Sequence, residues 1–475
     1  MSSLLLLALQ IFLILVKVKS AENNDPVIIC EPNTACICSN AIVTCNNVKW
    51  TEDEDGNEIF EPLRTSNVIV RRKDFFVEKA FFQFNAINKL EMDKILPAHE
   101  KTIKELDFSN NQIDVIGPFA FKKMENLEIL RLRSNKLDKL SSLSFAEGPS
   151  WKLRELYLDN NLLTNLSNDL FKKLSNLEKI VLDGNQNLII TRDIFKKNLD
   201  KLRTLSMNDC NLKDLDEDLF DELTALENLS LRGNPFTEIP RAVQDIPTLR
   251  TFDMSYTQIT EIQPNSLAYN KKLETIIFQG LSYLYVIHSC AFCGLKSLKD
   301  LLLTNATKLY LIEKDAFGTN KMRLPTLTNF DLEFANLSYL PHDLLDFRHI
   351  KYLKLGGNPW DCSCTMAWLL EFGLDLNQGS RTPECHSPMT LKNRHLNSMT
   401  LREFCPSHLI NKLVISLIIV FILSLIFVLT YYAIKNYHFR NVLYRVPLPH
   451  IGYSILDKDE EKNQMVIYIN PMKEI

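Results

Sequence analysis

The sequence predicts an α/β fold, a solenoid whose tandem coils share one curved parallel β-sheet, followed by a single transmembrane helix. Three observations support this fold class. A pattern of leucines recurs eleven times from residue 103 onward, a register of large apolar residues follows it, and residues 413–434 contain no charged side chain. The chain of 475 residues exceeds the size at which a single core stops growing, whereas a repeat array has no such limit.

The N-terminal segment, residues 1–20, has the features of a secretory signal peptide. Its apolar run from Leu4 to Val16 is too short to cross a bilayer, and Val18 and Ser20 provide the small side chains that a signal peptidase accepts. We therefore predict cleavage after Ser20. The eleven cysteines of the chain would then lie in an oxidising compartment, where disulfides form.

Two segments separate the signal peptide from the regular repeats. Residues 21–60 contain four cysteines, and we expect them to form an N-terminal cap because a solenoid exposes its apolar interior at both ends. Residues 61–102 are expected to form a degenerate repeat region. Asn67–Val70 and the run at 81–90 both suit strands, but their spacing does not fit two standard coils.

The regular repeats, predicted over residues 103–358, follow the template LxxLxLxxNxL. The first copy is IKELDFSNNQI at 103–113 and the last is IKYLKLGGNPW at 350–360. Within each copy the apolar residues alternate with polar ones, so they point to one side of a short strand. One such strand cannot bury its apolar face alone. The coils must therefore stack, and their strands must pair into one continuous parallel sheet.

Two further registers repeat with the same period. Large apolar residues are expected to fill the interior under the convex side: Phe121, Phe145, Phe171, Phe195 and Phe220. The Asn position of the template places a side-chain amide at a turn, where it can bond backbone groups that no strand satisfies. Leu281, Ala306 and Ala335 occupy this position in three later copies and cannot make those bonds. We therefore expect irregular coils between about residues 275 and 340.

These registers resemble those of the extracellular leucine-rich-repeat family over roughly residues 100–405. The resemblance implies a horseshoe closed by two cysteine-rich flanking modules. The spacing C-x5-C-x-C-x6-C resembles the N-terminal module, in which the family pairs the first cysteine with the third and the second with the fourth. For this chain that pattern implies the disulfides Cys30–Cys38 and Cys36–Cys45.

The segment NPWDCSC with two later cysteines, at residues 359–406, resembles the C-terminal flanking module. The family's pairing implies the disulfides Cys362–Cys385 and Cys364–Cys405. Zinc binding is the competing interpretation of each cysteine quartet, and secretion argues against it. Cys290 and Cys293 are expected to form a local disulfide, since a thioredoxin-like redox motif needs a different fold. Cys210 is expected to remain a buried thiol, and we predict no metal site.

A second apolar block, Leu413 to Ile434, contains 22 residues and would be about 33 Å long as a helix, enough to span a bilayer. Tyr431 and Tyr432 suit an interfacial aromatic belt, and basic residues follow at once, which predicts a cytoplasmic tail at 435–475. The expected topology is single-pass type I in the plasma membrane, with the ectodomain outside. In the tail, Tyr453-Ser-Ile-Leu456 resembles the YxxΦ sorting signal that clathrin adaptors bind.

The exposed strand positions are expected to form the concave face, which is the ligand face that the resemblance implies. A charged and aromatic cluster there suits an anchor for a protein partner, although most such side chains only face solvent. Its residues are Arg131, Arg133, Tyr157, Asp159 and Asp183. Sequons predict N-glycosylation at Asn165, Asn228, Asn305 and Asn336.

No catalytic motif is present, since HExxH, GxSxG and phosphate-loop patterns are all missing from the sequence. A formal net charge of −4 gives no reason to expect nucleic acid as a partner. We therefore predict a cofactor-free receptor, co-receptor or adhesion molecule that recognises a protein. The first alternative is a Toll-like signalling receptor without an intracellular domain, since the 41-residue tail is too short for one. The second is an ectoenzyme.

Overall fold

The computed structural model describes residues 26–443 apart from 32–35, 47–50, 53–57, 60–61, 73, 147–151, 197, 320–324, 326, 373–374, 377 and 406–408. The predicted signal peptide and the tail motif of Tyr453 and Leu456 lie outside these described residues. The chain divides into two compact units, Met1–Pro406 and Ser407–Ile475. Each unit is described by itself.

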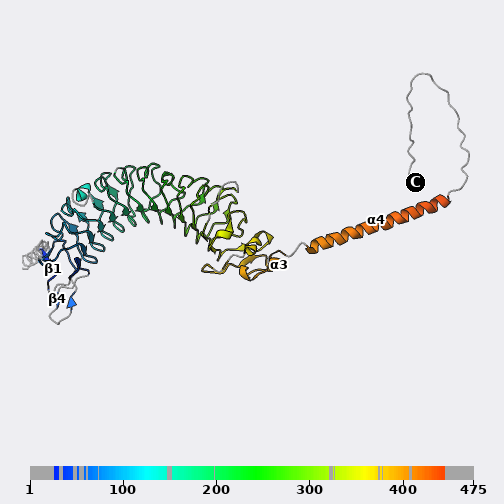
Figure 1. Cartoon of the computed structure of the whole chain (residues 1–475), viewed down its shortest axis with the longest axis horizontal. Helices are drawn as coiled ribbons and strands as arrows, with labels where there is room; N and C mark the ends of the chain where they lie inside the picture. Colours follow the sequence, from blue (N-terminus) through cyan, green and yellow to red (C-terminus); the bar gives the residue numbers. More distant parts are fainter. Residues whose placement is uncertain are drawn as a thin grey trace, which may run out of the picture. The chain divides into compact units, whose positions relative to one another are not determined.

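The first unit is an arc of stacked coils, and its long sheet follows the inner side of the arc (Figure 1). This sheet has 14 described strands, and beyond the antiparallel pair at its start every neighbouring pair is parallel. The predicted solenoid with a curved parallel sheet is therefore confirmed. Its strands are β2 (Ile37–Ser39), β3 (Ile42–Thr44), β7 (Lys79–Phe81), β9 (Glu105–Asp107), β11 (Ile129–Arg131), β13 (Glu155–Tyr157), β15 (Lys179–Val181), β16 (Thr204–Ser206), β17 (Asn228–Ser230), β18 (Thr251–Asp253), β20 (Thr275–Ile277), β22 (Asp300–Leu302), β24 (Asn329–Asp331) and β25 (Tyr352–Lys354).

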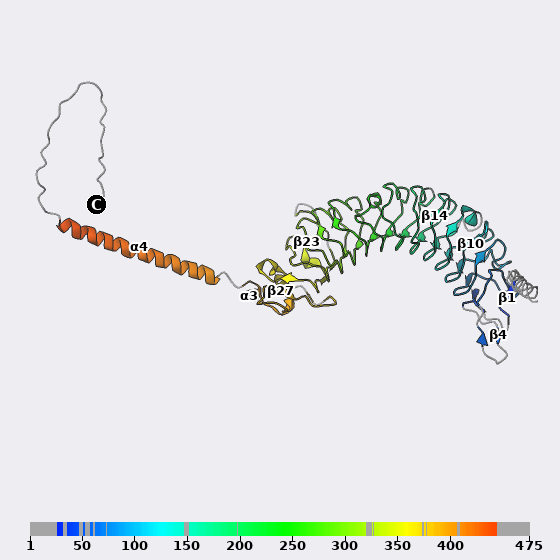
Figure 2. The same ribbon diagram turned by 180° about the vertical axis from the view of Figure 1, so that it is seen from behind.

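Shorter elements complete the coils and the caps, and several are marked in Figure 2. The short strands are β1 (Val27–Ile29), β4 (Thr51–Glu52), β5 (Glu58–Ile59), β6 (Val68–Val70), β8 (Lys89–Leu90), β10 (Val115–Ile116), β12 (Lys139–Leu140), β14 (Asn165–Leu166), β19 (Glu261–Ile262), β21 (Val286–Ile287), β23 (Leu311–Ile312), β26 (Trp360–Asp361) and β27 (Cys385–Ser387). The helices are η1 (Ser142–Phe145), η3 (Arg241–Val243), η4 (Phe347–His349), η5 (Cys364–Met366), α2 (Trp368–Glu371), η6 (Leu396–Ser398), α3 (Leu401–Phe404) and α4 (Leu409–Leu443).

The strands of the long sheet pair in a fixed register. Leu130 lies opposite Leu106 on one side and Leu156 on the other, and all three side chains are fully buried. Each central leucine is flanked by residues that point to the opposite face of the sheet, as the pleat requires. Because equivalent residues always meet, every coil places its apolar side chain in the same continuous core.

The second apolar register also lies where the sequence predicts. Phe121 stacks on Phe145 with ring centroids 5.7 Å apart, and Phe195 stacks on Phe171 at 6.1 Å. These rings are at most 1% exposed. A column of phenylalanines therefore fills the interior across from the sheet. Offset aromatic pairs at such separations add to the free energy of burying the rings.

Asparagine amides join successive coils. The Asn161 Nδ2 donates to the carbonyl oxygens of Leu132 (2.9 Å) and Leu158 (3.0 Å), and its Oδ1 accepts from the Leu137 amide (3.1 Å). One buried side chain thus satisfies backbone groups of two coils that the sheet leaves unpaired. Asn111, Asn135, Asn185, Asn234 and Asn358 make the same kind of contacts.

A twelfth coil precedes the eleven that the sequence predicts. β7 pairs with β9 in the same parallel register, and Asn85 donates to Cys45 O at 2.6 Å and accepts from the Leu63 amide at 3.0 Å. Residues 77–87 thus form a coil with the usual spacing to the next. Ala80 and Phe82 occupy two leucine positions, which obscures the pattern in the sequence. The other expected strand, β6, lies outside the long sheet and pairs with β1.

Irregular coils were expected between about residues 275 and 340, but the described strands of this range keep the regular register of the sheet, which contradicts that prediction. β20, β22 and β24 keep the sheet register, and Leu281 and Ala306 are fully buried in the core. A second parallel ladder of β19, β21 and β23 ties these coils together on another side. The loss of the amide bonds therefore does not disturb the strand register, and the apolar side chains add to the core.

The caps contain four disulfides, in the pairs that the family resemblance implies: Cys30–Cys38, Cys36–Cys45, Cys362–Cys385 and Cys364–Cys405. A fifth joins Cys290 to Cys293. In the C-terminal cap the Trp360 indole is fully buried, and its Nε1 donates to Leu355 O at 2.8 Å. The cap thus covers the last coil with an aromatic side chain whose polar atom is satisfied.

The second unit contains helix α4. Residues Val414–Asn436 of this helix are long and apolar enough to cross a membrane by length and composition. This segment overlaps the predicted span of 413–434. Within it, the hydroxyls of Ser424 and Thr430 donate to carbonyls of the preceding turn, at 2.7 and 2.9 Å, so both polar side chains are satisfied inside the helix.

We predict that Asn161→Ala lowers the free energy of unfolding by about 1–3 kcal/mol, because buried backbone groups lose their partners. The measurement is denaturant unfolding of the full chain in detergent. The matched control is Asn187→Ala, which changes an exposed asparagine of the next coil. Equal unfolding midpoints for the two variants would contradict the role of the amide.

Cys210 occupies an Asn position, and we predict that its thiol is inert in the folded chain. Its Sγ lies 3.2 Å from Leu182 O, and burial raises its pKa to about 12. Because the thiolate is the reactive form, iodoacetamide should not modify Cys210 at pH about 8 until the chain is unfolded. Peptide mass spectrometry before and after denaturation measures this. Rapid alkylation of the native chain would show that the thiol is accessible.

Candidate functional site

The five predicted ligand-contacting residues lie on three adjacent strands of the concave sheet. Arg131 and Tyr157 are the last residues of β11 and β13 and lie directly opposite each other. Arg133, Asp159 and Asp183 follow two residues after the ends of β11, β13 and β15, in the neighbouring column. The parallel register therefore brings together residues that are up to 52 positions apart in the sequence.

The Tyr157 ring is the centre of this cluster. The guanidinium carbons of Arg133 and Arg131 lie 4.4 and 5.3 Å from its centroid, and the Lys179 Nζ lies 5.1 Å from it. The ring is 6% exposed, and its hydroxyl donates to Glu155 at 2.7 Å. Three cations therefore enclose the tyrosine, which stabilises their charges but leaves little ring surface for a partner.

Ion pairs neutralise most of the cluster. Glu105 is paired with both Arg131 and Lys79, the latter at 2.9 Å. Burial of Glu105 would raise its pKa, but hydrogen bonds from Lys79 and Arg131 outweigh that effect and hold the pKa below its usual value. Asp159 pairs with Arg133 at 3.1 Å, yet burial raises the pKa of Asp159 despite that cation. The predicted patch is thus a rigid and largely self-neutralised platform.

Asp183 belongs to a different network. It accepts hydrogen bonds from the Ser206 hydroxyl (2.6 Å), from the Asn208 backbone N–H (2.8 Å) and from the Asn208 Nδ2 (3.1 Å). Asn208 in turn accepts from the Ser230 hydroxyl (2.6 Å) and from the Arg232 backbone (2.8 Å). An acid–amide ladder therefore crosses three coils and fixes the side chains next to the Tyr157 cluster.

A hollow of about 370 Å³ lies on the concave face beside this ladder. The central side chains change along the sheet from Tyr157 to Ser206 and Ser230, and this loss of bulk opens the surface. Thirteen residues line the hollow: Arg133, Lys179, Val181, Asp183, Thr204, Leu205, Ser206, Asn228, Leu229, Ser230, Thr251, Asp253 and Ile277. Arg133 and Lys179 lie at one end of the hollow and Asp253 lies toward the other, with small or apolar side chains between them.

Of the residues that line the hollow, only Arg133 and Asp183 are among the ligand-contacting residues predicted from the sequence. Lys179, Thr251 and Asp253 are strand residues whose sequence neighbours give no sign of a common site. The available signal was a column of small residues, Ser206 and Ser230, between larger ones. That signal becomes informative only once the register of the coils is known, because only then are these residues known to be adjacent.

The C-terminal cap covers the far end of the concave face. Glu333 accepts hydrogen bonds from the Ser380 hydroxyl (3.0 Å) and from the Arg381 amide (3.1 Å). The Arg381 guanidinium also lies 5.8 Å from the Phe334 ring. This loop of the C-terminal cap therefore forms hydrogen bonds with a polar side chain of the last coils. The part of the concave sheet that this loop leaves uncovered therefore lies N-terminal to Glu333.

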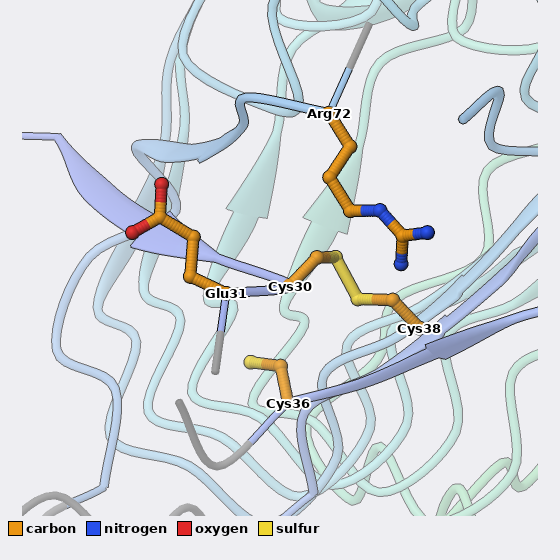
Figure 3. Close-up of a pocket in the computed structure, with 5 residues that line it drawn as sticks. All are labelled: Cys30, Glu31, Cys36, Cys38 and Arg72. Carbon is orange, nitrogen blue, oxygen red and sulfur yellow. A yellow bond between two sulfur atoms is a disulfide. The ribbon is translucent and has the colours of Figure 1, made fainter. Parts of the chain in front are cut away.

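Two other surface features lie away from the concave hollow, one in the N-terminal cap and one on a flank of the coils. In the N-terminal cap a hollow of about 460 Å³ adjoins the Cys30–Cys38 disulfide, and Figure 3 shows Arg72 reaching toward that disulfide while Glu31 points away. On the flank formed by β21 and β23, Tyr283, Tyr285 and Tyr310 are 48%, 38% and 56% exposed.

Among the residues that the structure describes, no group of three or more His, Cys, Asp or Glu side chains could hold a metal ion.

The four sequons occupy different surfaces. Asn165, Asn305 and Asn336 are exposed and lie outside the strands of the concave sheet. Asn228 is half-buried in β17 and lines the concave hollow. A glycan on Asn228 would therefore share space with any ligand of the hollow.

Comparisons with known proteins agree with the fold. The family model described as BspA type Leucine rich repeat region matches residues 98–227 and 189–323, in six copies. SLIT and NTRK-like protein 5 is 31% identical in mouse over 96 residues and 31% identical in human over 93 residues. Each match covers 19% of this chain and 10% of the relative. The chain thus spans about a tenth of the length of these relatives.

Among solved structures, a chain in the octameric complex of Latrophilin 3, Unc5D and FLRT2 has a TM-score of 0.50 to this chain. It is 18% identical, and the match covers 78% of this chain and 98% of that chain. At this identity the likeness concerns the fold alone.

We predict that Glu105 contributes stability at neutral pH that is lost in acid. Its pKa is lowered in the folded chain, so the contribution is present above the unfolded pKa and disappears as the pH falls through the folded pKa. The stability difference between wild type and Glu105→Gln should therefore shrink between about pH 5 and pH 3. Denaturant unfolding at each pH measures it.

The control for this prediction is Glu217→Gln. Glu217 pairs with Arg241 at 2.9 Å, but its side chain is 70% exposed and that of Arg241 is 76% exposed. Such a pair contributes little because water and salt screen it. An unchanged stability gap for Glu105→Gln across the pH range would contradict the buried ion pair.

Proposed function

The chain is a leucine-rich-repeat protein, and on that premise we propose that it is a cell-surface receptor, co-receptor or adhesion molecule that binds a protein ligand. The ligand contacts the concave hollow between the Tyr157 cluster and Ile277. The protein performs no catalysis of its own. The observation that carries the proposal is the hollow itself, a depression of about 370 Å³ with cations at one end and an acid at the other.

The hollow contains charges that are still available to a partner. Lys179 and Asp253 line the hollow and form no ion pair with any described residue, whereas Arg131 and Arg133 are already paired. A partner with a basic group facing Asp253 and an acidic group facing Lys179 would match this polarity. Such complementarity sets orientation and partner choice more than raw affinity.

The platform beside the hollow is rigid before any ligand binds. Arg133 pairs with Asp159 and packs on the Tyr157 ring, and Asp183 accepts hydrogen bonds from Ser206 and Asn208. Ligand binding therefore freezes few additional side chains, which lowers the entropic cost of association. Val181 and Ile277 provide apolar contacts inside this polar rim, an arrangement common to the energetically important centres of protein interfaces.

The class of ligand is also supported by similarity. The leucine-rich-repeat chain of similar fold belongs to an assembly with Latrophilin 3 and Unc5D. We propose the same class of ligand, a surface protein, for this chain. The apolar helix α4 and the disulfides support a type I plasma-membrane location with the coils outside. The tail motif of Tyr453 and Leu456 would then bind a clathrin adaptor.

We predict that filling the hollow abolishes ligand capture. Thr251 lines the hollow, and no hydrogen bond of its side chain is present among the described residues, so Thr251→Trp adds bulk without removing a contact. Full-length chain carrying an extracellular peroxidase would be expressed on cells, and labelled neighbours would be identified by mass spectrometry. Surface proteins labelled by wild type should be at least about tenfold depleted with Thr251→Trp.

The matched control is Lys173→Trp, which adds the same side chain at an exposed position outside the concave sheet. It should label the same proteins as wild type, and both variants should reach the cell surface in equal amounts. Identical labelling by wild type and Thr251→Trp would remove the hollow from consideration. Turnover of a surface substrate by the chain would overturn the proposal of a non-catalytic binder.

A further inference from the structure

Asn228 differs from the other three sequons in its position. It is the first residue of β17, at the middle of the concave sheet, with β16 paired on one side and β18 on the other. Of the four sequon asparagines, it alone lines the concave hollow. A modification at this position would therefore act on the surface that we assign to the ligand.

The local hydrogen bonds show how the sequon is held in the folded chain. The Asn228 Nδ2, the atom that an oligosaccharide would modify, donates to the Thr204 hydroxyl at 3.3 Å. The hydroxyl of Ser230, the third residue of the sequon, donates to Asn208 at 2.6 Å. A strand that is paired on both sides cannot bend into the active site of a glycosyl-transferring enzyme. An oligosaccharide must therefore be transferred to Asn228 before β17 pairs with β16 and β18.

The hollow has room for a sugar. The side chains around Asn228 are Thr204, Ser206, Ser230 and Thr251, whereas the same column carries larger charged residues in earlier coils, such as Glu155 and Lys179. Asp183 and Asp253 offer oxygen acceptors for sugar hydroxyls, and small apolar surfaces lie beneath them. A first sugar on Asn228 can thus lie in the hollow with its hydroxyls satisfied.

We propose that Asn228 carries an N-glycan that occupies the concave hollow, and that only chains without this glycan bind the ligand there. The second clause rests on the proposed function, whereas the first does not. The fraction of chains modified at Asn228 then sets the number of ligand-competent molecules on the cell surface.

The chemical step is an ordinary glycosyl transfer. A bond forms between the Asn228 Nδ2 and the anomeric carbon of a lipid-linked oligosaccharide. The bond from that carbon to the donor's diphosphate breaks, the lipid diphosphate leaves with the electron pair, and the amide nitrogen loses one proton. The co-substrate is the lipid diphosphate oligosaccharide of the secretory pathway, so no oxidant or reductant is needed.

The first test needs no ligand. Full-length wild type and Asn228→Gln would be purified from mammalian cells, and site occupancy would be measured by glycopeptide mass spectrometry. Both would then be treated with a water-soluble acylating reagent, and modification of Lys179, which lines the hollow, would be followed. Lys179 should react at least about threefold faster in Asn228→Gln, because a bulky glycan no longer covers it.

Two controls separate the glycan from other effects. Lys201 is exposed outside the hollow and should react equally in both proteins. Asn165→Gln removes a sequon outside the concave sheet and should leave Lys179 slow, while Ser230→Thr keeps the Asn228 sequon and should do the same. An unmodified Asn228 in wild type, or an equal Lys179 rate in wild type and Asn228→Gln, would overturn the proposal.

The second test uses the peroxidase fusion. Asn228→Gln should increase labelling of the surface proteins that Thr251→Trp loses. If labelling of surface proteins depends on Thr251 but not on Asn228, the glycan does not block ligand binding in the hollow, and the proposed function stands. If the glycan protects Lys179 but no variant labels a partner at this face, the glycan occupies the hollow and the proposed ligand site is wrong.

Discussion

The backbone ladder between equivalent residues of successive coils is the interaction on which the rest of the structure depends. Because each strand is only three residues long and pairs without slippage, a coil has no independent core and is stable only against its neighbours. The asparagine amides add a second link at the turn, where Asn161 bonds carbonyls of its own coil and of the preceding one. The strands of coils that lack the asparagine, β20, β22 and β24, keep the same register through these shared backbone bonds.

The same stacking of coils explains the backbone conformation at the turn that follows each strand of the long sheet. Each coil turns through a residue in the left-handed region just before the Asn position, including Tyr256 with φ of 59° and Phe334 with φ of 55°. After Tyr256 and Phe334 the next coil has glycine at this position, Gly280 and Gly357. A Cβ on Gly280 would lie 2.6 Å from the Tyr256 ring, so the tyrosine requires a residue without a Cβ atom at this position of the next coil. Stacking therefore imposes a pairing between residues about 24 positions apart.

Strict stacking also produces the concave surface. Side chains at one position of the repeat form a column, so charge, bulk and apolarity along that column depend on single residues in separate coils. Ion pairs between neighbouring coils, such as Glu105 with Arg131 and Asp159 with Arg133, make one part of the face rigid and neutral. Small residues open the adjacent part, and the C-terminal cap closes the end at Glu333. The hollow is thus bounded on both sides by features of the fold.

The sequence by itself determined the solenoid, its parallel sheet, the phenylalanine column and the apolar helix, because each follows from a periodicity that a repeat must keep in order to stack. The cysteine pairs followed from the resemblance of the caps to a known family. The coil at Asn85 escaped detection because Ala80 and Phe82 replace leucines, although the amide contacts are the usual ones. Only the tertiary structure decided that Tyr157 is enclosed by three cations, that Asp183 bonds to Ser206, and that Asn228 lines the hollow. These contacts join side chains from different coils, and no local pattern specifies how such side chains pair until the register places them side by side.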